Sequence, residues 1–346
     1  MSFRAWLSVI TLVLIGVILF FARHELAHAW QLLERVNIWI LLLLIPGQLL
    51  VYFASGEMMF SYLRAKKSIE KASPLALARM SLEMNFVNHV LPSGGVSGIS
   101  YMGWRLGHLG VSPGRAIMAQ MVRFATGFIS FIGLLMLAVL VVTIDGSINR
   151  WIILVSSVLA GVMIFAILAG VFLLSSTRRV TVFAEWLSKN VNKFVKKVSF
   201  GRVREVLKQD NVETFFLELE RDFDALKRDK KVLIKPILWG VVYTLADVSL
   251  FMITFWALGE PVNPAPILIA YGVATSAAFF VVTPGGAGAY EALMVTLLTI
   301  AGISQGAAIA GIVLTRVFVL LGTIGLGYLF YQHAIIKYGK NKQSNV

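Results

Sequence analysis

The sequence predicts an all-α integral membrane protein with two inverted-topology repeats, each in the order helix, helix, re-entrant hairpin, helix. Hydrophobic residues make up 58% of the 346 residues, and the mean hydropathy is +0.80. Four segments are nearly free of charge, at residues 7–20, 38–50, 128–142 and 152–174. Two similar motifs, Pro92-Ser93-Gly94-Gly95 and Pro284-Gly285-Gly286, also occur inside apolar surroundings. Long apolar segments of this kind are typical of membrane-spanning helices.

The distribution of charge predicts the topology. The formal net charge is +13, and residues 178–235 hold 15 of the 31 Lys and Arg residues. Because positive residues gather in loops that stay on the cytoplasmic side, this region and residues 64–71 are expected there. The charge therefore indicates membrane orientation and no nucleic-acid partner. We expect a multi-pass protein of the cell membrane, with both termini cytoplasmic.

Each expected span follows from an apolar segment and the charges at its ends. After a first helix that runs outward from Arg4, the expected spans are residues 38–63, 115–144, 151–175, 236–258 and 305–331. Two hairpins lie between them, with arms at residues 74–91 and 97–112 and at residues 266–282 and 287–301. The arms of the first are about 27 and 24 Å long, against an apolar bilayer core of about 30 Å, which predicts re-entrant segments. Three crossings separate the hairpins, and an odd number inverts the second.

One polytopic membrane domain is expected over residues 1–346. Its parts are a first repeat (1–145), an inverted second repeat (146–332) with a cytoplasmic basic insertion (178–235), and a cytoplasmic tail (333–346). Inverted repeats with broken helices are typical of secondary transporters, whose sites lie near the bilayer midplane.

The two halves carry matching motifs at matching intervals. Pro92 is followed after 18 residues by Gly110-Val111-Ser112, and Pro284 after 18 residues by Gly302-Ile303-Ser304. Arg123 and Arg316 follow the two prolines after 31 and 32 residues. The repetition favours a functional role for both arginines over a structural one.

The expected hairpin tips predict a site for an anion. The second arm of each hairpin begins just after its tip, so two helix N-termini with unsatisfied N–H groups would point into the membrane. Two guanidinium groups nearby suit a phosphate, which arginine binds bidentately. The expected ligand is the headgroup of a phospholipid or polyisoprenyl phosphate. The candidate binding residues are Asn85, Asn88, His89, Pro92, Ser93, Gly94, Gly95, Arg123, Pro284, Gly285, Gly286, Gly288, Glu291 and Arg316.

Other polar residues within the spans have a structural alternative. Glu83 and Asp247 are candidate coupling or counter-ion groups, but Glu83 also lies four residues after Arg79, a spacing at which the two would neutralise each other. Asn85 and Asn88 would equally cap or cross-link neighbouring helices. No catalytic residue, metal ligand or cofactor is assigned.

Two regions of the chain resemble a known family. Residues 88–124, NHVLPSGGVSGISYMGWRLGHLGVSPGRAIMAQMVRF, and residues 283–318, TPGGAGAYEALMVTLLTIAGISQGAAIAGIVLTRVF, look like the signature regions of the flippase-like family named for the transmembrane region of lysylphosphatidylglycerol synthases. The resemblance covers nearly the whole chain. It implies movement of a lipid or lipid-linked group between leaflets, without the soluble synthase domain. It differs at Gly98, which Ile99 follows where members often have glutamate.

Two other functions remain as alternatives. His24-Glu25-Leu26-Ala27-His28 matches the HExxH pattern of zinc metalloproteases, in which His24 and His28 would bind zinc and Glu25 would activate water. The same residues also suit an amphipathic helix at the membrane interface, which we favour. The second alternative is a scaffold that transports nothing and anchors a lipid-modifying enzyme. The expected partners are anionic membrane lipids, with a second copy of the chain or a lipid-synthesis enzyme as further candidates.

Overall fold

The computed structural model describes residues 13, 16–17, 20, 23–32, 34, 36–90, 96–144, 150–198, 209–278 and 288–339. All regular secondary structure within these ranges is helical. Most of the first expected span, residues 92–95 and residues 284–286 lie outside them. The helices are α2 (Arg23–Leu32), α3 (Ile38–Leu41), α4 (Leu44–Ala65), α5 (Pro74–Val90), α6 (Val96–Gly107), α7 (Pro113–Ile144), α8 (Arg150–Leu174), α9 (Thr177–Val198), α10 (Gln209–Arg228), the 3-10 helix η1 (Lys230–Leu233), α11 (Ile234–Ala257), α12 (Pro264–Ala278), α13 (Ala289–Ile300) and α14 (Gln305–Tyr338).

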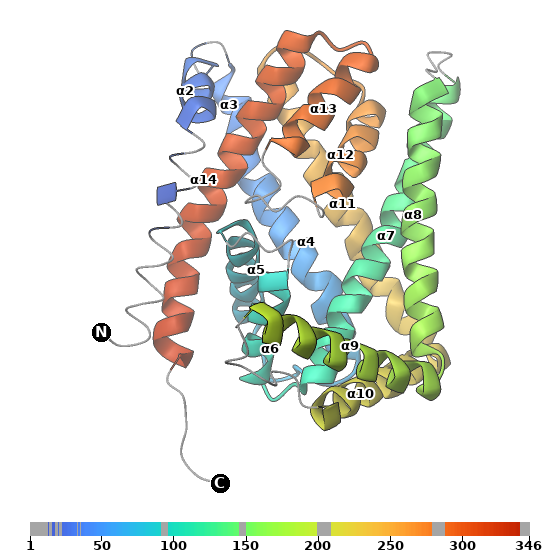
Figure 1. Cartoon of the computed structure of the whole chain (residues 1–346). Helices are drawn as coiled ribbons and strands as arrows, with labels where there is room; N and C mark the ends of the chain where they lie inside the picture. The colour runs from blue at the N-terminus through green and yellow to red at the C-terminus, as the bar shows by residue number, and fades with distance from the viewer. Residues whose placement is uncertain are drawn as a thin grey trace.

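Five long helices run between the two ends of the bundle in Figure 1: α4, α7, α8, α11 and α14. In the described part of the chain, five segments are long and apolar enough to cross a membrane: Ile38–Ala65, Pro113–Val141, Leu154–Leu174, Lys230–Ala257 and Gln305–Tyr338. They coincide with five of the spans predicted from hydropathy. The chain is therefore a multi-pass membrane protein.

Two pairs of short helices lie at opposite ends of the bundle. Figure 1 shows α5 and α6 at the lower end and α12 and α13 at the upper end. The members of each pair pack against each other, and α5 and α13 both also pack against α14. With 17, 12, 15 and 12 residues, these helices are about 18 to 26 Å long at 1.5 Å per residue. Each is shorter than the apolar core of a bilayer.

Proline and glycine account for several helix boundaries. α5, α7 and α12 each begin at a proline, which is favoured at the first helical position because its missing N–H would have no helical partner. α6 ends at Gly107, earlier than the predicted residue 112, and the chain turns at Gly110, where φ is +81°. α14 continues to Tyr338, beyond the predicted residue 331.

The duplicated Gly-Val-Ser and Gly-Ile-Ser tripeptides form the same turn. Gly110 and Gly302 have φ of +81° and +95°, and the N–H of the next residue bonds to a carbonyl five residues earlier, Val111 to Leu106 and Ile303 to Leu298. This is the Schellman ending of a helix. The serine then caps the next helix: the Arg115 N–H donates to Ser112 Oγ and the Ala307 N–H to Ser304 Oγ, at 3.4 and 3.3 Å. The tripeptide repeat therefore encodes one turn used twice.

Small and polar residues hold the long helices together. A Cβ atom built on Gly327 of α14 would lie 2.4 Å from Phe86 Cβ of α5. Ser130 Oγ of α7 donates to the Ile237 carbonyl of α11 at 2.8 Å, and Thr315 of α14 donates to Thr254 of α11 at 2.8 Å. Close approach of backbones and hydrogen bonds between helices are the main means of packing in a bilayer, where burial of apolar groups adds little.

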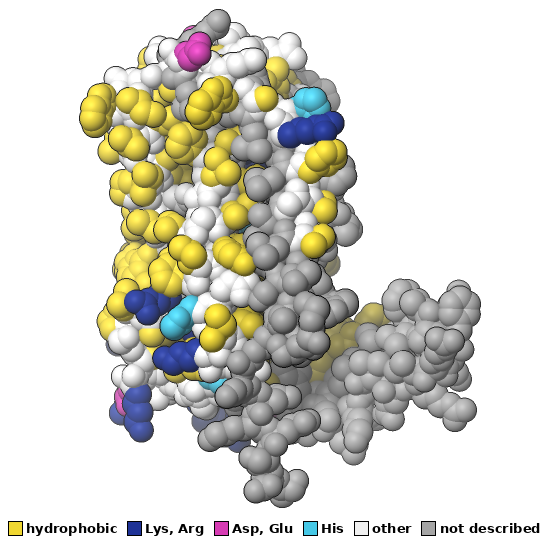
Figure 2. All heavy atoms as spheres, turned by 90° about the vertical axis from the view of Figure 1, so that its left-hand side faces the viewer, with side chains coloured by type: hydrophobic (Ala, Val, Ile, Leu, Met, Phe, Trp, Pro, Cys, Tyr) yellow, Lys and Arg dark blue, Asp and Glu magenta, His cyan; other side chains and the backbone are white. Residues whose placement is uncertain are grey.

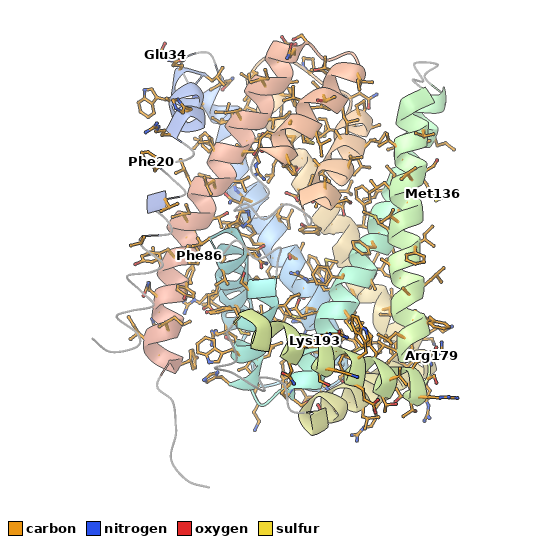
Figure 3. The ribbon with its side chains drawn as sticks, viewed as in Figure 1. Phe20, Glu34, Phe86, Met136, Arg179 and Lys193 are labelled. Atoms are coloured by element: carbon orange, nitrogen blue, oxygen red, sulfur yellow. The ribbon has the colours of Figure 1, made fainter. Side chains whose placement is uncertain are left out.

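The outer surface of the bundle is apolar between its ends. Figure 2 shows hydrophobic side chains over the middle of one face, with Lys, Arg, His and acidic side chains near the two ends. On α7 and α8, Met136 and Phe165 are 67% and 73% exposed, as expected for side chains that contact lipid tails. In Figure 3, Arg179 and Lys193 lie at the lower end and Glu34 at the upper end.

The basic insertion contributes two helices that lie across the lower end of the bundle. α9 and α10 pack against each other, and α10 also packs against α7 (Figure 1). Phe216, Leu219 and Phe223 of α10 are buried against the core, whereas Trp186 of α9 is 57% exposed. A charged helix with an apolar face and an exposed tryptophan suits the membrane interface.

We expect Gly327→Ala to destabilise the protein, because the added methyl group would overlap Phe86 Cβ and approach the Leu82 carbonyl of α5. Overpacking of this kind costs about 1–3 kcal/mol. Gly325→Ala is the matched control on the same helix, where an added Cβ meets nothing within 4 Å. Thermal unfolding in detergent should show a lower Tm for Gly327→Ala alone, and equal Tm values for the two variants would contradict the packing described here.

Candidate functional site

Arg123 lies on α7 inside the bundle and contacts neutral groups. Its guanidinium donates to Ser55 Oγ of α4 at 3.3 Å and approaches Met84 Sδ of α5 at 3.5 Å. Among the described residues, no carboxylate lies within 4 Å of the guanidinium. A charge at this depth is costly unless an anion or polar groups compensate it. Arg123 could therefore accept an external anion without displacing a carboxylate of the described residues.

Arg316 on α14 has a resident anionic partner. Its Nε donates to Glu291 Oε1 of α13 at 2.8 Å, and its guanidinium lies 4.5 Å from the centre of the Tyr290 ring. The other oxygen of the same carboxylate accepts from the Gly288 N–H at 2.7 Å, at the N-terminus of α13. Glu291 thus occupies the place beside a helix N-terminus and an arginine where the sequence predicted a phosphate.

Asp247 lies on α11, which packs against α7 and α14, the helices that carry Arg123 and Arg316. The Tyr271 hydroxyl of α12 donates to Asp247 Oδ2 at 2.6 Å. Arg316 and Tyr243, one helical turn before Asp247, are within electrostatic range of the carboxylate, and Arg123 is within range of Tyr243. Each arginine is therefore in electrostatic range of a side chain on the same turn of α11.

The polar residues at the end of α5 have local partners, and Asn88 caps a neighbouring helix as the structural alternative predicted, whereas Asn85 bonds within its own helix. Asn88 Oδ1 accepts from the Gly98 N–H of α6 at 2.9 Å, so it caps the second arm of the pair. Asn85 Nδ2 donates to the Ser81 carbonyl at 2.8 Å, and His89 Nδ1 lies 2.9 Å from the Asn85 carbonyl. His89 is also within electrostatic range of Arg316. A side chain of α5, in the first half, is therefore within electrostatic range of a charged side chain of the second half.

The pairing of Arg79 with Glu83 that the spacing suggested is wrong. Glu83 instead accepts from Arg105 Nε of α6 at 2.7 Å and from the Tyr101 hydroxyl at 2.9 Å, and the side chains of Glu83 and Arg105 are 3% and 8% exposed. Arg79 points to the exposed side of α5, over the Phe330 ring. Glu83 of α5 thus links α5 to α6. Its partners, Tyr101 and Arg105, differ from the partner of Asp247, Tyr271.

Seven of the predicted site residues lie outside the described ranges: Pro92, Ser93, Gly94, Gly95, Pro284, Gly285 and Gly286. Of the others, Glu291 contacts Arg316, and His89 and Asp247 are within electrostatic range of Arg316, whereas Arg123 is within range of Tyr243 on α11. Asn88 of α5 caps the start of α6, and Gly288 lies at the N-terminus of α13.

The HELAH segment forms part of α2, as either interpretation of it requires. The side chains of Glu25 and His28 lie outside the described residues, whereas His24 is exposed. Within the described part of the chain, no group of three His, Cys, Asp or Glu side chains is arranged to hold a metal ion.

Sequence reasoning missed the neutral groups that surround the charges. Ser55 and Met84 contact Arg123, and three tyrosines, Tyr243, Tyr271 and Tyr290, surround Asp247 and Arg316. Two of the tyrosines had a signal: Tyr243 precedes Asp247 by one helical turn and Tyr290 precedes Glu291 directly. Ser55 and Met84 had no such signal in the sequence, because their contacts with Arg123 depend on how α4, α5 and α7 pack together.

The fold and this cluster define a multi-pass helical membrane protein with charged groups gathered inside its bundle. Residues 6–327 match the family described as the lysylphosphatidylglycerol synthase TM region. The match covers most of the 346 residues, and the chain belongs to this family. No curated protein sequence matches the chain closely enough to count as a relative.

We expect Glu83→Gln to lower the stability markedly, because it would leave the Arg105 guanidinium buried without its carboxylate. Loss of one partner of a buried ion pair costs about 3–5 kcal/mol. The control is Asp224→Asn, which breaks the Asp224–Lys227 pair, whose side chains are 50% and 42% exposed, at a cost of about 0–1 kcal/mol. Thermal unfolding of both variants in detergent compares them, and a Tm change no larger for Glu83→Gln would show that the buried pair is unimportant.

Proposed function

We propose that the protein is a lipid flippase that moves an anionic phospholipid or a polyisoprenyl-phosphate-linked lipid between leaflets. The headgroup phosphate would bind between Arg123 and Arg316, while the tails remain in the bilayer. Membership of a lipid-associated membrane family supports this class of function.

The observation that carries the proposal is the environment of Arg123. It is an arginine inside an apolar bundle whose contacts among the described residues, Ser55 and Met84, are neutral. Guanidinium binds phosphate bidentately, and a pairing with phosphate would offset the cost of holding this charge within the membrane. A second arginine in the matching position of the other half, Arg316, adds a further donor to the same region.

The Glu291 carboxylate gives the site a way to bind and release its ligand. Glu291 is bonded to both Arg316 and the Gly288 N–H, which are the groups that would hold a phosphate. A lipid phosphate that enters would take over one or both of these donors. When the lipid leaves, Glu291 returns, so neither donor is left unpaired in a medium that contains little water.

Alternating access would follow from two inverted repeats with re-entrant hairpins. Three features support this arrangement: the short helices α5 and α6 lie at the opposite end from α12 and α13 (Figure 1), each is shorter than a bilayer core, and one type of turn precedes both α7 and α14. Rocking of one repeat against the other would expose the arginines to each leaflet in turn.

We place the protein in the cell membrane with the α9–α10 end in the cytoplasm. Arg178, Arg179, Lys189 and Lys193 belong to this end, and positive residues are retained on the cytoplasmic side. We propose that both termini also lie in the cytoplasm.

Replacement of either site arginine should slow translocation. Hydrogen bonds to charged groups contribute about 1.5–3 kcal/mol, so Arg123→Ala or Arg316→Ala should reduce the rate by about ten- to a hundredfold. The assay follows fluorescent phosphatidylglycerol between leaflets of proteoliposomes. Arg79→Ala is the matched control, since Arg79 lies on the exposed side of α5. Rates equal to wild type for both site variants would reject the assigned roles, and no translocation by wild type would reject the function.

Glu291→Gln should tighten the binding of anionic lipid. The glutamine keeps the size of the side chain but removes the negative charge that competes for Arg316, so the affinity should rise on the order of tenfold. Native mass spectrometry of the purified protein with phosphatidylglycerol measures this affinity. Weaker binding by Glu291→Gln would mean that Glu291 helps to hold the lipid and does not compete with it.

A further inference from the structure

A polar pocket of about 470 Å³ lies at the lower end of the bundle. Neither Arg123 nor Arg316 lines it. It is bounded by residues 67–68 after α4, residues 110–112 before α7, Arg115, and one face of α10. Residues 67–68 directly follow one membrane span and residues 110–112 directly precede another. The pocket therefore lies where the spans end, at the depth of lipid headgroups.

Three of the charged side chains that line the pocket form no ion pair with a described residue, although Glu218 is within electrostatic range of Arg115. Arg115 is paired with Asp222, at 3.2 Å between Nε and Oδ2. Among the described residues, Lys67, Arg221 and Glu218 form no ion pair within 4 Å, although all three line the same space. The pocket thus offers two available cations and one available carboxylate.

The position of each group is fixed by its backbone. Glu218, Arg221 and Asp222 occupy positions i, i+3 and i+4 on one face of α10, the face that lines the pocket. The Glu218 carboxylate lies against the start of α7, where a Cβ on Gly114 would be 2.6 Å from Oε2.

A buried hydroxyl group near two of the lining residues has no partner. The Tyr62 hydroxyl of α4 has no hydrogen-bond partner among the described residues. Tyr62 does not line the pocket, but it is within electrostatic range of Arg115 and Asp222, which do. A buried polar group is normally hydrogen-bonded, so this hydroxyl indicates room for an ordered water near these two residues.

We propose that this pocket binds a phosphate group joined by a short linker to a primary ammonium group, the chemistry of phosphoethanolamine. Lys67 and Arg221 bind the phosphate oxygens, and Glu218 accepts hydrogen bonds from the ammonium group. A simple anion would use the cations and leave Glu218 facing a like charge, whereas a zwitterion uses all three groups. The volume suits a small ligand. The source is either the headgroup of phosphatidylethanolamine or a soluble phosphoethanolamine compound. This site is independent of the proposed transport site.

The first experiment measures binding of soluble O-phosphoethanolamine and of inorganic phosphate to the purified full chain by calorimetry. Lys67→Gln and Arg221→Gln should weaken phosphoethanolamine binding about tenfold each. Glu218→Gln should weaken phosphoethanolamine binding and leave or improve the binding of inorganic phosphate. Arg228→Gln and Asp229→Asn, exposed residues near the end of α10 that do not line the pocket, are the matched controls.

A second experiment identifies the source of the ligand. The protein is placed in nanodiscs of phosphatidylcholine with or without phosphatidylethanolamine, and the lipids that it retains are counted by native mass spectrometry. Preferential retention of phosphatidylethanolamine that is lost in Glu218→Gln assigns the site to the lipid, because a quaternary ammonium has no N–H to donate. Binding of the soluble compound without lipid retention assigns it to a free ligand. Equal effects of Glu218→Gln on phosphate and phosphoethanolamine, or no binding of either source, would overturn the proposal.

Discussion

Charges inside this bundle must find their partners within the protein, because the bilayer core offers none. This requirement accounts for most of the polar contacts between helices. Glu57 pairs with Arg64, Glu83 with Arg105 and Glu291 with Arg316, in each case inside or at the edge of an apolar helix. Leaving one such group unpaired in hydrocarbon costs more than several surface contacts contribute. Among the described residues, Arg123 and Asp247 form no such ion pair, and Arg123 is the residue on which the functional argument rests.

The ends of the short helices follow the same requirement. A helix N-terminus leaves N–H groups without partners inside the helix, and this holds for α6 and α13. Asn88 satisfies one of these groups at α6 and Glu291 satisfies one at α13. In each half a side chain accepts a hydrogen bond from an N–H group at a helix N-terminus, but the acceptor is a neutral amide in the first half and a carboxylate in the second. This difference makes the halves chemically unequal even though their turns are alike.

Much of the fold could be predicted because hydropathy identifies the segments that are apolar enough to lie within a bilayer. Five spans lie where long apolar segments predicted them, and the Gly110 and Gly302 turns were marked by their repetition. The end of α6 was placed too late because a glycine with positive φ stops the helix several residues before the serine that caps the next one. The site was predicted less well. Its arginines stood out as charges in apolar segments, but the partner of Glu83 depended on which side of α5 faces α6, and spacing alone favoured Arg79.

The bond between Glu291 and Arg316 has an energetic consequence for a carrier that works in cycles. A carrier must also change conformation after it has released its cargo, and an uncompensated cation at its centre would make that return step expensive. In the carrier proposed above, an internal carboxylate that moves with the arginine would keep the Arg316–Glu291 pair electrically neutral during the empty passage. The membrane potential would then exert little force on this pair, and it would act on the cycle mainly through Arg123 and the charge of the lipid that is carried.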